Sequence, residues 1–195
     1  GTNRKLAASR IKTYAGFTAT TITGTTALAT QPAPADEIII SDAGTLKRTD
    51  IKHISNTPAF HVVKNAVQAI NNSTSTLLTW QTEQLDSDGT FASNRFTPAI
   101  AGRYFIYAAL VVDQLDDGKV LYAQIKKNGS LLLTSQMHTG VGSSVTSYVA
   151  GHVQLGDSDY VEAFIQHNHG SARNAVNGTN PGSFFGGFRL TGMES

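Results

Sequence analysis

The stretch Arg103-Tyr104-Phe105-Ile106-Tyr107-Ala108-Ala109-Leu110-Val111-Val112 decides the fold. Side chains of a β-strand alternate between its two faces, so even positions share one face and odd positions share the other. Both sets are apolar here, the even set from Tyr104 to Val112 and the odd set from Phe105 to Val111. A strand with two apolar faces lies between two packed layers, or between a core and a subunit interface. The stretch therefore predicts a central strand of a layered β-protein.

Further strands are predicted on the C-terminal side of this stretch. Asn128-Gly129 separates two apolar runs and is a strong hairpin signal, because a type I′ turn needs positive φ at both central residues. A second hairpin is expected between residues 147–155 and 160–167, with its turn at 156–159. Strands of this length with regular turns predict an all-β sandwich or jelly roll. The other predicted strands cover residues 120–127, 130–136 and 184–190.

Composition excludes several classes of protein. The 195 residues include no cysteine, which excludes a disulfide scaffold, a thiolate zinc site and a cysteine nucleophile. No apolar run approaches the roughly 20 residues of a membrane helix, so we expect no membrane insertion. With 15 basic and 14 acidic residues the net charge is +1, which gives no case for specific nucleic-acid binding.

Residues 1–57 differ in character from residues 58–195. Residues 1–35 hold four bases and no acid, a charge of +4, whereas the remainder holds 11 bases and 14 acids, a charge of −3. The basic start is not followed by an apolar stretch and is not a signal peptide as it stands. Prolines at 32 and 34 indicate an extended spacer, and residues 38–48 predict a small hairpin around 41–44. An isolated hairpin is marginal in water, so we expect an extended N-terminal arm, residues 1–57, that packs on a partner.

The first 17 residues combine basic and apolar side chains. They could pair with an acidic protein surface, touch packaged nucleic acid or stay solvated; four charges bind duplex only weakly at physiological salt. We favour anchoring to a protein surface of a larger assembly. The predicted anchoring residues are Arg4, Lys5, Leu6, Arg10, Ile11, Lys12, Tyr14 and Phe17.

Residues 58–195 carry an ordered series of aromatic and glycine positions. These are Trp80, Asp86, Phe91, Phe96, then Gly102-Arg103-Tyr104-Phe105-Ile106, Lys127-Asn128-Gly129, Leu155-Gly156-Asp157 and, at the end, Ser183 to Leu190. The series resembles the C1q/TNF-like jelly-roll module. Trp80 stands where the family has Phe, Ile106 replaces an aromatic, and the spacing from Phe91 to Phe96 is two residues short. The resemblance implies a ten-stranded jelly roll that forms a tight homotrimer. Its expected core and trimer-interface residues are Trp80, Phe91, Phe96, Tyr104, Phe164, Phe184 and Phe188.

A second resemblance lies in the arm. The segment from Ala35 to Ile51 is similar to one found ahead of such modules in tailed-bacteriophage virion proteins. It implies a structural protein located in the virion, with the major capsid protein or another virion protein as partner. Capsid decoration (a cement protein) is the favoured role, because the chain has no heptads or repeats for a long shaft. A tail fibre or tip that recognises a host surface receptor is the alternative. A secreted C1q-like binding protein is the third and would need a cleaved signal peptide upstream of Gly1.

Several side chains are candidates for metal binding or catalysis. His167 and His169 are two residues apart on a predicted strand and could grip one metal, or meet as three pairs at a trimer axis; the alternative is two solvent-facing histidines. Asp157 and Asp159, with Asp86 and Asp88, could bind Ca²⁺, although aspartates are routine in turns. No serine is placed beside a histidine and an acid in a recognisable pattern. We therefore expect a non-enzymatic protein without a required cofactor.

Overall fold

The computed structural model describes residues 24–30, 32–33, 35–140, 142–175 and 182–190. The chain divides into two compact units, Gly1–Ile51 and Lys52–Ser195. The division that we predict after residue 57, between arm and jelly-roll domain, remains a prediction. Within the described ranges, no helix has the length and apolar character needed to cross a bilayer.

The first unit contains a β-hairpin. Strands β1 (Glu37–Asp42) and β2 (Thr45–Asp50) pair antiparallel, with Asp42 opposite Thr45. The two turn residues, Ala43 and Gly44, have φ of 49° and 84°, as a type I′ turn requires. The hairpin has little burial of its own, since Leu46 is 77% exposed and Ile39 is 64% exposed. A short 3-10 turn, Ile51–His53, follows β2.

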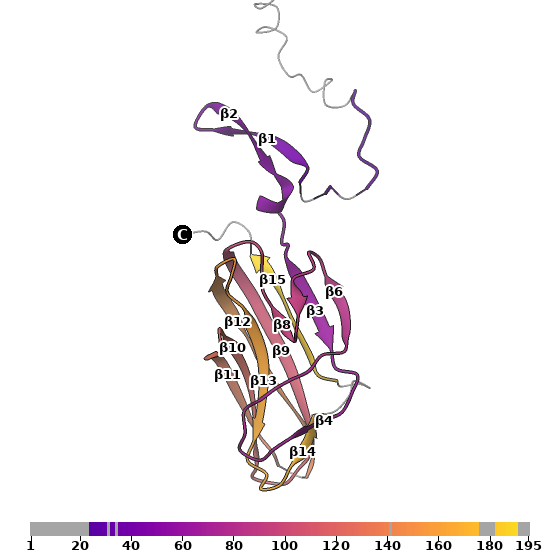
Figure 1. Cartoon of the computed structure of the whole chain (residues 1–195), viewed down its shortest axis with the longest axis vertical. Coiled ribbons are helices and arrows are strands. Elements are labelled where there is room, and N and C mark those ends of the chain that lie inside the picture. The colour runs from indigo at the N-terminus through magenta and orange to yellow at the C-terminus, as the bar shows by residue number, and fades with distance from the viewer. Residues whose placement is uncertain (1–23, 31, 34, 141, 176–181, 191–195) are drawn as a thin grey trace, which may run out of the picture. The chain divides into compact units, whose positions relative to one another are not determined.

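The second unit is built from two antiparallel sheets, and most of their strands are labelled in Figure 1. Strand order in one sheet is β11-β10-β13-β8-β7, with β5 also paired to β13. In the other, β9 pairs with β12 on one side and with β15 and β14 on the other, and β15 continues to β3 and β6 while β14 continues to β4. The bounds are β3 Ala59–Val63, β4 Gln68–Ile70, β5 Thr76–Leu77, β6 Thr82–Asp86, β7 Phe91–Ala92, β8 Arg95–Phe96, β9 Gly102–Leu115, β10 Val120–Lys127, β11 Ser130–His138, β12 Ser143–Leu155, β13 Val161–His167, β14 Arg173–Ala175 and β15 Phe184–Leu190.

The connections between these strands give the chain a jelly-roll β-sandwich. The chain crosses from one sheet to the other between β8 and β9, β9 and β10, β11 and β12, β12 and β13, and β13 and β14. From β8 to β14, all successive strands except β10 and β11 are thus placed in opposite layers, which is the jelly-roll arrangement. The all-β fold expected from the sequence is confirmed, and β10 and β11 pair around Asn128-Gly129 as predicted.

One predicted hairpin is wrong. Residues 147–155 and 161–167 are in strands, but they do not pair with each other: β12 pairs with β9, and β13 pairs with β10. The turn at 156–159 carries the chain from one sheet to the other. Sequence neighbours pair or lie side by side in only about two-thirds of cases, and periodicity does not distinguish a hairpin from such a crossing.

The core lies between the two sheets. The even-numbered residues of β9 from Tyr104 to Val112 share one face, as predicted, and that face points inward. They pack against Leu121, Ala123 and Ile125 of β10 and Val161, Ala163 and Ile165 of β13. Phe60 stacks on Phe96 with ring centroids 4.3 Å apart. This interior is close-packed and apolar, so single groups placed within it have large effects on stability.

Lys64, which follows β3, is the exception in this interior because its side chain is fully buried. Its ammonium donates to the amide oxygen of Gln68 at 3.0 Å and to the carbonyl and hydroxyl oxygens of Thr79 at 3.0 and 3.3 Å. All three acceptors are neutral. Burial therefore dominates and lowers the pKa of Lys64 from 10.5 to about 8.

This lysine predicts a pH dependence of stability. Between pH 8 and 10.5 the unfolded chain holds a proton at Lys64 that the folded chain has released, so the free energy of unfolding rises with pH across that window. Between pH 7 and pH 10 the gain is about 2 kcal/mol. Urea unfolding of the wild type and of Lys64→Met at both pH values measures it, since tyrosine ionisation is common to both proteins. Equal pH slopes for the two proteins would contradict the prediction.

Candidate functional site

The outer face of one sheet carries a cluster of partly exposed aromatic side chains. The odd-numbered residues of β9 point outward, and register places Phe105 opposite Phe188 and Tyr107 opposite Gly186 of β15. On the far side of β15, Phe184 is opposite Val63 and Gly186 is opposite His61 of β3. On the other side of β9, Tyr148 of β12 is opposite Ala109. We call this surface the aromatic face; its aromatic members are His61, Phe105, Tyr107, Tyr148, Phe184 and Phe188.

The rings of the aromatic face contact one another across the strands. Phe105 and Phe188 have centroids 5.7 Å apart, and Phe184 lies 5.5 Å from His61 and 6.1 Å from Tyr107. At the edges, Tyr148 is 61% exposed and Leu85 of β6 is 48% exposed. Contiguous apolar surface of this kind is uncommon on monomeric proteins and is typical of interaction sites.

Two groups on this face are kept uncharged. The Tyr107 hydroxyl and Nδ1 of His61 form a hydrogen bond of 3.0 Å. Burial lowers the pKa of His61 and raises the pKa of Tyr107, so both neutral forms are favoured at neutral pH. The pair thus satisfies two polar atoms without adding charge to an apolar surface.

Gly186 is the residue that lets Tyr107 lie flat against β15. A Cβ at this position would come within 2.4 Å of the Tyr107 hydroxyl oxygen and 2.5 Å of its ring. Any side chain at residue 186 would therefore displace the tyrosine ring from the face. The sequence Gly186-Gly187 thus has a local packing reason as well as its place in the family pattern.

The structure distributes the predicted core and interface residues over three environments. Phe91, Phe96 and Tyr104 lie in the core between the sheets, and Trp80 packs against it while partly buried. Phe184 and Phe188 are on the aromatic face, half-buried. Phe164 is on the outer face of the other sheet, where the Lys126 ammonium lies 3.8 Å from its ring centroid. Participation of any of them in a trimer interface remains a prediction.

Sequence reasoning did not assign site roles to four members of the aromatic face, His61, Phe105, Tyr107 and Tyr148. The signal was present for two of them, because Phe105 and Tyr107 are on the odd-numbered face of the opening stretch. His61 and Tyr148 stand alone in mixed segments, and only strand register brings them to this surface. The predicted anchoring residues, Arg4, Lys5, Leu6, Arg10, Ile11, Lys12, Tyr14 and Phe17, lie outside the described residues.

The two histidines of the predicted metal pair make hydrogen bonds within the chain. Nε2 of His167 donates to the carbonyl oxygen of Ile70 at 3.0 Å, and its Nδ1 accepts from the backbone N–H of His169 at 3.3 Å. Burial, above all, lowers the pKa of His167. The His169 ring contacts Asp116, Ser171 and Arg173. Within the described residues no group of three His, Cys, Asp or Glu side chains is arranged around a common metal position. A metal between these histidines remains a prediction and would have to displace those bonds.

The aspartates considered for Ca²⁺ support turns. Asp86 accepts hydrogen bonds from the backbone N–H groups of Thr90 and Phe91. Asp159 accepts from Lys127 at 2.8 Å and from the backbone N–H of Gly156 at 2.7 Å. These bonds, the Lys127 bond first, hold the pKa of Asp159 well below its usual range. Their carboxylates thus tie the chain to itself, as aspartates in turns commonly do.

Comparison with known proteins finds similarity to solved structures. No family model and no curated protein matches the chain. One of the similar structures is the globular domain of zebrafish complement 1qA protein, at 19% sequence identity and a TM-score of 0.49. The similarity covers 68% of this chain and 96% of that one. Identity at this level says nothing about a ligand or a partner.

Proposed function

We propose that this chain is a non-enzymatic structural protein of a bacteriophage virion, a homotrimeric capsid decoration protein that binds the particle through its arm. The observation that carries the proposal is the aromatic face. Apolar surface of this kind, with ring contacts across β3, β15 and β9, is favourably buried when a second copy covers it and removes it from water. The proposal of three subunits rests on the resemblance to the C1q/TNF-like residue pattern.

The arm supplies the attachment. The β1–β2 hairpin exposes Ile39 and Leu46 to solvent, so it buries little apolar surface without a partner. The charge of +4 over residues 1–35 complements an acidic protein surface. The likeness of residues 35–51 to phage virion segments is the reason for placing that surface on a phage particle, with the major capsid protein as the favoured partner.

Two rival functions use the same fold. A tail fibre or tip protein would display the jelly roll to a host receptor, and a secreted C1q-like binding protein would act outside any particle. Copy number separates the first from decoration: quantitative mass spectrometry of purified particles should find this chain at a stoichiometry comparable with the shell protein. A few trimers per particle would instead assign it to the tail, and its absence from particles would favour secretion.

The anchoring role makes a prediction for the arm. Deletion of residues 1–35 should leave a soluble trimer that no longer joins the particle, because the basic and apolar contacts of the arm are removed. Co-sedimentation with particles that lack the protein measures incorporation. The matched control is a full-length chain with Arg4, Lys5, Arg10 and Lys12 changed to Gln, which separates charge from chain length. Undiminished incorporation of the deletion variant would refute anchoring by the arm.

A further inference from the structure

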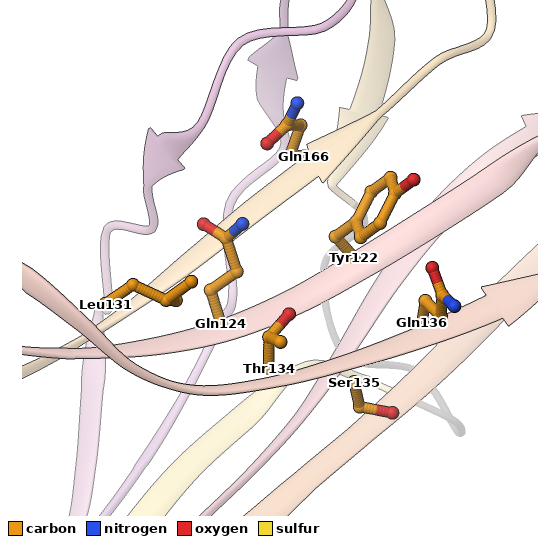
Figure 2. A pocket seen from close by; sticks show the side chains of 7 residues that line it. All are labelled: Tyr122, Gln124, Leu131, Thr134, Ser135, Gln136 and Gln166. Atoms are coloured by element: carbon orange, nitrogen blue, oxygen red, sulfur yellow. The ribbon is translucent and has the colours of Figure 1, made fainter.

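The sheet that contains β11, β10 and β13 carries a hollow on its outer face. Its lining residues are mostly polar, unlike the aromatic face of the other sheet. The hollow has a volume of about 430 Å³, within the range of small-molecule sites, and is formed by β10, β11 and β13. Figure 2 shows Tyr122, Gln124 and Gln166 projecting into it from neighbouring strands. We call it the amide hollow; its lining includes Tyr122, Gln124, Leu131, Thr134, Gln136 and Gln166.

Strand register sets an aromatic ring between two amides. Tyr122 is directly opposite Gln136 on one side and Gln166 on the other. Neighbouring strands are about 4.8 Å apart, so the backbones that carry the two glutamines are separated by roughly 9.6 Å with the tyrosine midway. Gln136, Tyr122 and Gln166 therefore form a row across the three strands, with the aromatic ring in the middle and a hydrogen-bonding amide at each end.

The polar groups of this row are available to a ligand. Within the described part of the chain, no side-chain hydrogen bond occupies the Tyr122 hydroxyl or the amides of Gln136 and Gln166. Gln124 is only 9% exposed, and its amide oxygen accepts from the Ser75 hydroxyl at 2.7 Å. That bond fixes the amide so that its nitrogen points toward Tyr122, as Figure 2 shows. A pre-oriented buried donor is typical of a binding site.

The lining excludes charged ligands. It contains no acidic or basic residue. The two charged residues nearest in register on this outer face are already engaged: Lys126 lies over Phe164, and Glu162 accepts from Arg95 at 3.0 Å. A phosphate, carboxylate or ammonium would lose its hydration here without gaining an opposite charge. The lining therefore favours a neutral ligand.

A neutral sugar matches both the aromatic ring of the row and the amides on either side of it. A pyranose has an apolar C–H face that packs on an aromatic ring, and a rim of hydroxyls that each donate and accept. Glutamine amides also donate and accept, so they satisfy hydroxyls of either orientation. Purely apolar ligands would leave the three amides without partners.

We propose that the amide hollow binds a neutral oligosaccharide, with one pyranose ring on Tyr122 and its hydroxyls bonded to Gln136, Gln166 and Gln124. The site belongs to the sheet opposite the aromatic face. This inference does not rest on the virion role. A trimer that joins particles but binds no sugar would overturn only this proposal, and sugar binding by a chain absent from particles would overturn only the other.

The test is titration calorimetry of the full-length protein with maltohexaose, cellohexaose, mannohexaose and chitohexaose, and with hexagalacturonate as the acidic comparator. At least one neutral hexasaccharide should bind with a Kd of about 1 mM or tighter. Tyr122→Ala should weaken that binding at least about tenfold, because it removes the platform. Gln136→Ala and Gln166→Ala should each weaken it by a factor of about five.

Two variants control for folding and for location. Tyr122→Phe keeps the ring and should retain most of the affinity. Gln84→Ala removes an exposed glutamine from β6 of the other sheet and should leave affinity unchanged. Failure of every neutral probe to bind would overturn the proposal, as would tighter binding of hexagalacturonate or equal affinity of the wild type and Tyr122→Ala.

Discussion

Gly187→Val is expected to destabilise the jelly roll by about 3 kcal/mol or more, which lowers Tm by about 10 °C. Residue 187 lies in β15, opposite Ile106 of β9 and Phe60 of β3. A Cβ there would be 2.5 Å from Cδ1 of Ile106 and 2.9 Å from the carbonyl oxygen of Phe105. The isoleucine can change rotamer, but the carbonyl belongs to a paired central strand and cannot withdraw without breaking its ladder. Valine adds two methyl groups to the same crowded space.

Calorimetry of the variant measures this effect. Gly140→Ala is the matched control, because a Cβ at residue 140 would have no atom within 4 Å. Its Tm should stay within about 2 °C of the wild type. A Gly187→Val protein with the Tm of the control would mean that β15 does not lie between β9 and β3 as described.

Phe184→Glu is expected to convert the proposed trimer into monomers. The side chain is half-buried on the aromatic face, so the isolated jelly roll can hydrate a carboxylate there. Each interface in the trimer would instead bury a charge against the rings of His61 and Tyr107. An unpaired buried carboxylate costs several kcal/mol, and the cost is repeated at three symmetry-related positions.

Light scattering of the purified variant reports its molar mass, and circular dichroism confirms that it remains folded. Met137→Glu places the same charge on β11 of the other sheet, at a residue that is 43% exposed, and should remain a trimer. Dissociation of both variants would indicate a general effect of charge. A trimeric Phe184→Glu protein would place the subunit contact elsewhere.

Much of the fold is predictable because strands leave local signals. The two-sided apolar pattern of residues 103–112 identifies the central strand, and Asn128-Gly129 identifies the hairpin that joins β10 and β11. The partners of β12 and β13 are not local information. A turn at 156–159 fits both a hairpin and a crossing, and only the packing of two sheets decides between them.

The candidate sites depend still more on tertiary structure. Phe184 and Phe188 were predicted from the family pattern, but their neighbour Tyr148 comes from a strand more than thirty residues earlier. The amide hollow joins Gln166 to Tyr122 and Gln136 purely through strand register. Lys64 looks like an ordinary surface lysine in sequence, and its burial follows from the packing of Gln68 and Thr79 around it. Contacts of this kind between distant segments leave no periodic pattern in the sequence, so the sequence alone does not predict them.

The molar mass of the full-length protein in solution tests the central claim most directly. Size-exclusion chromatography with multi-angle light scattering at neutral pH should give three times the chain mass of 20.7 kDa. That mass should persist on dilution to micromolar concentration, as expected when the aromatic face is covered by a tight interface. A mass of one chain at these concentrations would contradict the account, because the aromatic face would then be open to solvent and no trimer would exist to decorate a particle.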